Sequence, residues 1–333
     1  MIRKASKAAA LAAATTAAIV LLAGCSSTTS TPTATPSHIK LAGVFTNTSD
    51  PFWETMSCGA TNEAKTLGVS LQTFNTTTTD TNTIASDFQT ASLTNPDGLI
   101  VQPFNNNQFV AQYTKLMKDG VPVVTANGTV PQVNYKTIYS GTNTGGIASQ
   151  VSSLIPSGSG SLVVMGGAPG IPPLQTRTQP FINAVEKMRS DLTPLSVEYS
   201  GFDANKATTD VSSLIIAHPD LKLIIAADGP DGVAAAAAVK QAGKVGKIAV
   251  IAFDAVPNEV QALKAGQITA LIAQDPYKIG ADSVKAIVDY LNSHKSGGAV
   301  KPAGSATIAN QLLTKKTVDD PSNAKYLYKA TCS

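Results

Sequence analysis

The sequence predicts an α/β protein with two lobes, each built on a doubly wound parallel β-sheet. From residue 39 onward, short runs rich in aliphatic and β-branched residues alternate with amphipathic segments of helical length. Continuous apolar strands separated by helices are typical of parallel sheets that are covered on both faces. The pattern occurs twice, before and after residues 140–144, and therefore predicts two such lobes.

The expected elements follow from the apolar periodicity along the chain. The expected strands span residues 39–45, 69–74, 98–101, 122–125, 161–165, 195–199, 221–226, 248–253 and 268–273. The expected helices span residues 51–67, 83–93, 108–118, 174–188, 204–217, 232–241 and 276–291. At the start of the first helix, Pro51 suits the first helical position and Asp50 suits the capping position before it.

Composition and charge narrow the class of protein. Of the 333 residues, 43% are hydrophobic and 14% are charged, which suits a globular chain with a full core. Three of the 25 basic residues lie before Cys25, and the remaining 22 balance 22 acidic residues. A chain without net positive charge lacks the general attraction to phosphates, so we expect no nucleic-acid partner.

The first 24 residues have the features of a lipoprotein signal peptide. Arg3, Lys4 and Lys7 form a basic start, and a weakly apolar stretch follows over residues 8–22. The stretch ends in Leu22-Ala23-Gly24-Cys25, which resembles the lipobox of bacterial lipoproteins. Cys25 would then carry acyl chains and anchor the protein to a membrane outside the cytoplasm. The alternative is an ordinary signal peptide that contains this cysteine by chance.

Residues 25–37 are expected to form a flexible tether, because residues 26–37 contain no hydrophobic side chain larger than alanine. Two cysteines remain beyond the tether, Cys58 and Cys332. In an oxidising compartment they permit one disulfide, which would fasten the C-terminal tail to the first helix. Two unpaired thiols are the alternative, because the sequence does not give their separation in space.

Five hydrogen-bonding side chains follow expected strands, at or near the carboxyl ends. They are Thr46, Asn127, Asp228, Asp254 and Gln274. Taken singly, each suits a helix cap or a turn. Open α/β sheets bind their ligands at the carboxyl ends of the strands, so five such residues in two lobes favour a shared crevice.

Aromatic and charged residues nearby indicate the chemistry of the ligand. Phe52 and Trp53 follow Asp50 where the first strand turns into its helix, and they could offer aromatic faces to the C–H side of a sugar or polyol. The planar fork of Arg177 could bond two neighbouring oxygens. The residues expected to bind the hydroxyl groups are Asp50, Asn127, Asp228, Asp254 and Gln274. Packing in the core is the alternative for the aromatic pair, and a surface position is the alternative for Arg177.

From about His38 to Asn310 the chain resembles the sugar-binding type I periplasmic binding proteins, and among them the ribose-binding proteins. The resemblance rests on the order and spacing of short motifs: Asp50-Pro51-Phe52-Trp53, Asp97-Gly98-Leu99-Ile100, Gly120-Val121-Pro122-Val123-Val124, Gly201-Phe202-Asp203, Ala217-His218-Pro219-Asp220, Ala252-Phe253-Asp254 and Ala273-Gln274.

The resemblance implies a ligand site and a hinge. The implied ligand contacts are Thr46, Asp50, Phe52, Trp53, Asn127, Arg177, Phe202, Asp228, Asp254 and Gln274, of which Phe202 comes from the resemblance alone. The implied N-terminal lobe comprises residues 38–140 plus 276–305, and the C-terminal lobe comprises residues 141–275 plus 306–333. Three crossing segments, near residues 140–142, 274–276 and 305–310, would join the lobes.

Two departures from ribose-binding proteins bear on the ligand. This chain has Asn127-Gly128 where those proteins typically have Asp-Arg, and Asp228 where asparagine is common. A buried hydroxyl that loses its partner costs about 1–3 kcal/mol, so such changes alter ligand identity. We therefore expect a different monosaccharide or a sugar alcohol.

The expected function is that of a solute-binding lipoprotein of an ABC importer, which delivers its ligand to a membrane permease. A separate subunit would hydrolyse ATP, because this chain lacks the phosphate-binding loop. A signalling receptor for a sugar-like ligand is one alternative, and a sugar-modifying enzyme is another. The glycine-rich run at residues 166–170 lacks the dinucleotide-binding pattern, and the three histidines lack metal-ligand spacing. We expect no enzymatic activity, no cofactor and no metal.

Overall fold

The computed structural model describes residues 39–78, 80–103, 107–128, 130, 133–141, 144–294 and 297–332, without the side chains of residues 144, 172, 173, 176 and 177. The expected signal peptide, the tether and Cys25 lie outside these residues. Within the described part of the chain, no helix is both long and apolar enough to cross a membrane.

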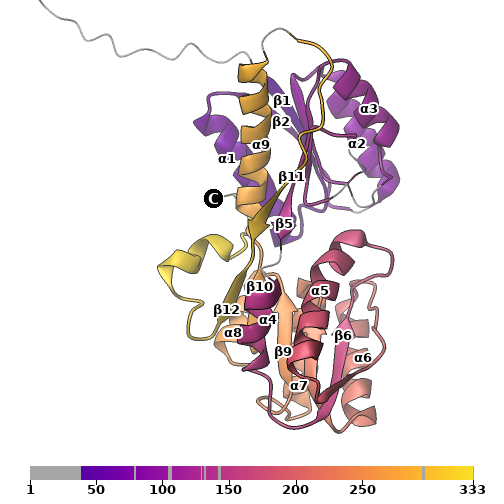
Figure 1. Ribbon diagram of the computed structural model, residues 1–333, viewed down its shortest axis with the longest axis vertical. Coiled ribbons are helices and arrows are strands. Elements are labelled where there is room, and N and C mark those ends of the chain that lie inside the picture. Colours follow the sequence, from indigo (N-terminus) through magenta and orange to yellow (C-terminus); the bar gives the residue numbers. More distant parts are fainter. Residues whose placement is uncertain are drawn as a thin grey trace, which may run out of the picture. The chain divides into compact units, whose positions relative to one another are not determined.

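The first sheet has six strands in the order β11-β5-β4-β3-β1-β2, and all of its pairings are parallel (Figure 1). Its strands are β1 (Lys40–Phe45), β2 (Ser70–Asn75), β3 (Gly98–Val101), β4 (Val123–Ala126), β5 (Lys136–Gly141) and β11 (Ser305–Ala309). The order places the carboxyl ends of β1, β3 and β4 side by side at one edge of the sheet.

Helices cover both faces of the first sheet. They are α1 (Pro51–Thr66), α2 (Thr81–Leu93), α3 (Val110–Lys118) and α9 (Pro276–Ser293). Successive side chains of a strand point to opposite faces, so a strand buried on both sides reads as a continuous apolar run. In β1, Leu41 and Phe45 pack with α1 and α9, whereas Ala42 and Val44 pack with α2 and α3.

The second sheet repeats this order as β12-β10-β9-β8-β6-β7, with β12 antiparallel to β10 and the other pairings parallel. Its strands are β6 (Gly160–Met165), β7 (Leu192–Pro194), β8 (Leu221–Ala226), β9 (Ala249–Phe253), β10 (Ala270–Ala273) and β12 (Gln311–Thr314). The predicted fold class, with two doubly wound lobes, is therefore confirmed.

The helices of the second lobe also form two layers. They are α4 (Thr144–Ser152), α5 (Pro172–Met188), α6 (Ala204–Ala217), α7 (Gly229–Gln241) and α8 (Pro257–Lys264). Leu162 and Val164 of β6 pack with α4 and α5, and Val163 and Met165 pack with α6, α7 and α8. Helices cover both faces of β6, so residues 162–165 are all apolar.

The expected strand at residues 195–199 is wrong in position, because the structure has β7 at Leu192–Pro194. The amides of Leu195 and Glu198 still donate to the carbonyls of Leu162 and Val164 in β6. The contact beyond β7 is reduced to an isolated bridge between Met165 and Glu198. The segment thus follows the edge of the sheet without forming a continuous ladder.

The chain passes between the sheets after β5, between β10 and α9, and between β11 and β12. The expected lobe boundary at residues 305 and 306 falls inside β11, which pairs with β5 of the first sheet. The change of sheet lies later, between Ala309 and Gln311, because β12 pairs with β10. Ser140 Oγ hydrogen-bonds Asn310 Oδ1 and so links two of these crossings.

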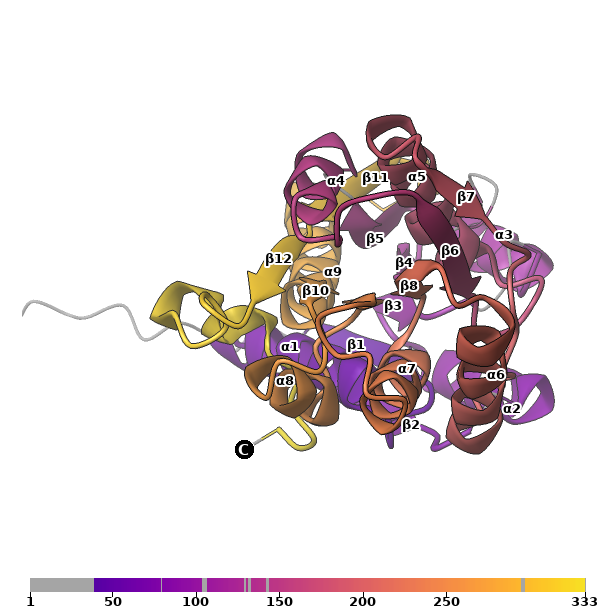
Figure 2. The same ribbon diagram turned by 90° about the horizontal axis from the view of Figure 1, so that it is seen from below.

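A disulfide joins Cys58 of α1 to Cys332 near the C-terminus, with the two Cα atoms 5.1 Å apart. Before it, the chain forms a short 3-10 helix, η1 (Pro321–Tyr326). Figure 2 shows this last part of the chain beside α1 and α8. Of the two alternatives that the sequence leaves open, the structure has the paired cysteines.

Two glycines let α1 and α9 pack closely. A Cβ atom at Gly59 would lie 1.9 Å from the carbonyl oxygen of Tyr277, and one at Gly280 would lie 2.0 Å from that of Met56. Both obstacles are backbone atoms, which cannot move aside as a flexible side chain could. The separation of these helices therefore depends on the missing side chains.

We expect Gly59→Ala to lower the free energy of unfolding by about 3 kcal/mol, because overpacking against backbone forces the helices apart. The matched control is Gly145→Ala in α4, where a Cβ atom meets nothing within 4 Å. That change should be neutral or stabilise by about 0.5–1 kcal/mol. Urea unfolding followed by circular dichroism measures both, and equal effects of the two substitutions would contradict the packing argument.

Candidate functional site

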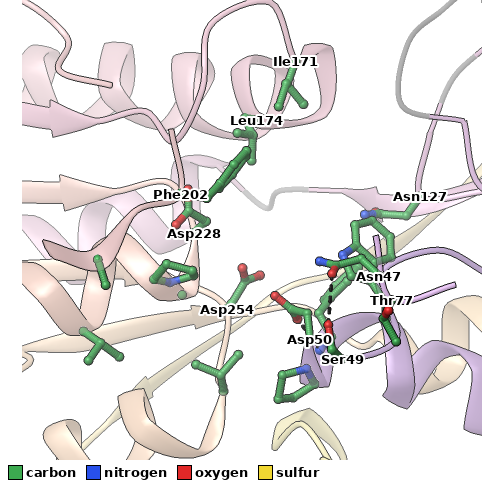
Figure 3. Close-up of a pocket in the computed structure, with 18 of the residues that line it drawn as sticks. Asn47, Ser49, Asp50, Thr77, Asn127, Ile171, Leu174, Phe202, Asp228 and Asp254 are labelled. Atoms are coloured by element: carbon green, nitrogen blue, oxygen red, sulfur yellow. Dashed lines mark hydrogen bonds between the residues drawn. The ribbon is translucent and has the colours of Figure 1, made fainter. Parts of the chain in front are cut away.

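A cleft of about 1170 Å³ lies between the carboxyl ends of the two sheets (Figure 3). Both lobes contribute its walls. The polar lining residues are Asn47, Ser49, Asp50, Thr77, Thr78, Gln102, Asn127, Asp228, Asp254 and Asn258. The larger apolar ones are Phe52, Trp53, Ile171, Leu174, Phe202, Val233 and Val256. This is the place where open α/β sheets bind ligands.

Seven of the ten predicted contacts line this cleft, namely Asp50, Phe52, Trp53, Asn127, Phe202, Asp228 and Asp254. Thr46 and Gln274 are buried, with 0% and 2% of their surface exposed, and neither lines the cleft. Arg177 lies in α5, but its side chain is outside the described part of the structure, so its role stays a prediction.

Gln274 lies behind Asp254 and supports its carboxylate. Gln274 Nε2 donates a hydrogen bond of 2.6 Å to Asp254 Oδ1, and the hydroxyl of Tyr328 donates to the same oxygen at 3.2 Å. The backbone amide of Gln274 in turn donates a hydrogen bond of 3.1 Å to the hydroxyl of Tyr328. Two donors on one oxygen fix the carboxylate of Asp254 at the wall of the cleft.

Asp228 caps α7, and its Oδ1 accepts a hydrogen bond of 3.0 Å from the amide of Asp231. Asp231 is fully buried behind it, and its Oδ2 accepts from the amide of Gly167 at 3.0 Å. Burial raises the pKa of the Asp231 carboxyl, although hydrogen bonds from the Ser200 side chain and the Gly167 backbone oppose this. The carboxyl group of Asp228 thus lies at the wall of the cleft, and that of Asp231 lies behind it.

The opposite wall is built on the N-terminus of α1. Asp50 Oδ1 accepts a hydrogen bond of 2.8 Å from the amide of Phe52, and Pro51 occupies the first turn, as the sequence predicts. Phe52 meets Trp53 edge to face, with ring centroids 4.6 Å apart. In Figure 3 the carboxylates of Asp50 and Asp254 point from opposite lobes into the same space.

Backbone strain is concentrated at the cleft. Among the described residues, six that are not glycine have positive φ, and four of these line the cleft: Asn47, Asn127, Phe202 and Asp254. Asparagine and aspartate tolerate this region, but a bulky residue such as Phe202, with φ of 65°, does not adopt it without cost. Such strain persists where surrounding contacts hold it, and it gathers at functional sites.

Sequence reasoning missed Gln102, which directly follows β3 and lines the cleft. The residue is 1% exposed, and neither of its side-chain amide atoms has a hydrogen-bond partner among the described residues. A buried amide without partners is costly, so this group suits a ligand that bonds it. The strand-end rule that identified Asn127 after β4 applies equally to Gln102.

The lining combines carboxylates with aromatic rings. Asp50, Asp228 and Asp254 line the cleft together with Phe52, Trp53 and Phe202. Carboxylates accept hydrogen bonds from hydroxyl groups, while the aromatic residues offer apolar faces. The arrangement can therefore hold a small molecule that carries many hydroxyl groups.

The buried carboxyl of Asp231 predicts a pH dependence of stability. A raised pKa means that the folded protein holds this proton more tightly than the unfolded chain, whose value is near 3.8. The free energy of unfolding contributed by Asp231 therefore falls as pH rises above about 4, when the folded state must bear a buried charge. Asparagine does not ionise, so Asp231→Asn does not lose this contribution. The free energy of unfolding of the variant should therefore rise relative to that of the parent as pH rises.

Urea unfolding at a series of pH values measures this difference. Asp80→Asn serves as a control of opposite sign, because the backbone hydrogen bond from Thr83 lowers the pKa of Asp80. Its contribution to stability is present above 3.8 and is lost as pH falls. A constant difference between Asp231→Asn and the parent would contradict the assignment.

The comparisons with known proteins agree with this geometry. The D-allose-binding periplasmic protein of Escherichia coli is 27% identical over 272 residues, which cover 78% of this chain and 86% of that protein. The ribose import binding protein of Bacillus subtilis is 26% identical over 248 residues, which cover 74% of this chain and 79% of that protein.

A solved structure is similar in fold. It is an ABC transporter solute-binding protein from Agrobacterium vitis, bound with α-D-tagatopyranose, with a TM-score of 0.76 and 25% sequence identity. The match covers 87% of this chain and 99% of that one. Residues 42–296 match the family described as the periplasmic binding protein domain. The chain therefore belongs to the periplasmic binding protein family and has the two-lobed fold of its type I members.

Proposed function

We propose that this protein captures a monosaccharide or sugar alcohol between its lobes and delivers it to the permease of an ABC importer. The observation that carries the proposal is the cleft between the two sheets, where carboxylates, amides and aromatic rings from both lobes line one space. The named relatives bind sugars or belong to sugar import systems, which supports the same class of ligand.

The lining supplies the two kinds of contact that a sugar needs. Asp50, Asp254 and Asn127 would bond hydroxyl groups, while Trp53 and Phe202 would lie against C–H faces. Because these residues come from both lobes, a ligand that touches both stabilises the arrangement in which the lobes are closed. Closure excludes water, which strengthens each polar contact.

Carboxylates also bear on which sugar is bound. Asp228 stands where ribose-binding proteins commonly have asparagine, and a carboxylate accepts hydrogen bonds but donates none. The Asn127-Gly128 pair replaces the Asp-Arg that is typical there and so lacks that cation. We therefore propose a ligand that presents hydroxyl donors to both places and that differs from ribose.

Calorimetry of residues 26–333 tests the proposal. We expect saturable binding of at least one member of a panel that contains D-allose, D-ribose, D-tagatose, the tetritols and the pentitols. Asp254→Ala should weaken the best-bound compound by about 2 kcal/mol, or roughly 30-fold, because hydrogen bonds to a charged group are lost. The control is Asp289→Ala on the exposed side of α9, where the carboxylate pairs with Lys285.

Absence of saturable binding across the whole panel would contradict the proposed class of ligand. Equal affinities in Asp254→Ala, Asp289→Ala and the parent would instead contradict the proposed site and leave the class of ligand standing.

We also propose that a lipid on Cys25 anchors the mature protein to the outer side of a membrane. The basic start, the apolar stretch and the lipobox-like Leu22-Ala23-Gly24-Cys25 support this. Two acyl chains give stable attachment at about 0.8 kcal/mol per buried methylene.

The expected result is that Cys25→Ser moves the protein from the membrane fraction to the soluble fraction of the cell envelope. Cys58→Ser is the matched control, because it changes a cysteine of the folded part and leaves the anchor intact. A Cys25→Ser protein that stays with the membrane fraction would exclude this anchor.

A further inference from the structure

The last eighteen residues of the described chain, 315–332, form what we call the C-terminal strap. It starts at the end of β12, in the second sheet. Asp319 Oδ1 forms an ion pair of 2.5 Å with Lys264 Nζ of α8, and Val318 is 1% exposed and belongs to the buried core. Asn323 Nδ2 donates to the carbonyl of Thr317 at 2.9 Å and closes the turn. The first part of the strap is therefore fixed to the second lobe.

The far end of the strap is fixed to the first lobe. The amide of Lys329 donates a hydrogen bond of 2.7 Å to Thr55 Oγ1 in α1. Cys332 then forms the disulfide with Cys58 of the same helix. The strap thus leaves one lobe and is covalently fastened to the other.

Tyr328 lies where the strap passes from one lobe to the other, and it is 5% exposed. Its backbone amide donates to the carbonyl of Ala255 at 3.2 Å. Its hydroxyl donates to Asp254 Oδ1 and accepts a hydrogen bond from the backbone amide of Gln274. Its ring meets the ring of Phe52 at 5.5 Å between centroids, tilted by 64°. One side chain therefore contacts cleft residues of both lobes, Asp254 and Phe52.

We propose that the C-terminal strap is a fourth connection between the lobes and that Tyr328 is a positioning residue, which holds Asp254 and Phe52 in the arrangement that binds ligand. The inference rests on the proposed function, because it concerns the same cleft. Tyr328 itself does not line the cleft. It acts through the two residues that do.

The backbone of Asp254 shows why such support is needed. Its φ of 87° lies in the left-handed region, which aspartate tolerates better than bulky residues but which still costs free energy that neighbouring contacts must offset. Tyr328 bonds the carboxylate of Asp254, the carbonyl of the next residue and the amide of Gln274. Two of these bonds are made by the Tyr328 hydroxyl and one by its backbone amide, and together they connect the ends of β9 and β10 to one residue.

The disulfide keeps Tyr328 in place. Apart from the disulfide, the strap contacts α1 through the two hydrogen bonds between Thr55 and Lys329 and through Cys332 Sγ, which lies 3.4 Å from Glu54 Oε1, and Lys329 itself is exposed. Short segments at the end of a chain that are held by few contacts open readily. Removing the cross-link gives the strap the conformational freedom that the covalent bond denies it.

Hydrogen–deuterium exchange without ligand tests the arrangement. Tyr328→Phe keeps the ring against Phe52 but removes the hydroxyl that accepts a hydrogen bond from the backbone amide of Gln274. Hydrogen exchange at this backbone amide should therefore become about tenfold faster. Cys58→Ala combined with Cys332→Ala should also accelerate it, through release of the strap. Tyr326→Phe is the matched control on the same strap, because among the described residues the Tyr326 hydroxyl makes no hydrogen bond to this network, and it should leave exchange at Gln274 unchanged.

Calorimetry then tests the effect on the cleft, at a temperature where circular dichroism shows every variant folded. Tyr328→Phe should bind the panel compound that saturates the parent about tenfold more weakly, because the Asp254 carboxylate loses a hydrogen bond. Tyr326→Phe should bind it as the parent does. A merely structural role for Tyr328 would lower stability without changing the affinity of the folded protein.

The outcomes separate the two proposals. Unchanged exchange at Gln274 in Tyr328→Phe overturns the positioning role, and so does unchanged affinity in a parent that binds a panel compound. A parent that binds none of D-allose, D-ribose, D-tagatose, the tetritols and the pentitols overturns the proposed function, and the exchange measurement then decides the role of the strap alone.

Discussion

The site depends on one constraint, namely that parallel strands bring all of their carboxyl ends to the same edge of a sheet. In the first lobe this places Gln102 and Asn127 beside the start of α1, and in the second lobe it places Asp228 and Asp254 side by side. The two sheets have the same strand order, so the same edge recurs in each lobe. Two equivalent edges that face one cleft provide polar groups from both sides without any insertion in the fold.

The fold and most of the cleft could be predicted from the sequence because both depend on local patterns. Continuous apolar runs identify strands buried on both faces, and the next polar residue marks the carboxyl end, as with Asp254 after β9. Gln274 follows the same rule, but its side chain donates to Asp254, and its backbone amide donates to the hydroxyl of Tyr328, which lies far along the chain. That arrangement depends on a tertiary contact, and no local pattern contains it.

The pairing of Cys58 with Cys332 has the same physical origin. Their separation of 274 residues gives no information about their distance in space, which depends on the course of the strap over α8 and α1. The edge segment beyond β7 illustrates the other limit of sequence patterns. Its apolar residues fit a strand, yet only Leu195 and Glu198 keep backbone bonds to β6, because an edge has a partner on one side alone.

The strap also bears on how the two walls of the cleft are supported. A strained backbone at a site persists where surrounding contacts hold it, and here Asp254 is held by a residue outside the repeated α/β pattern. The disulfide anchors that support in α1, which is capped by Asp50 and carries Phe52 and Trp53 in its first turn. Support for one wall is thus fastened to the element that forms the other.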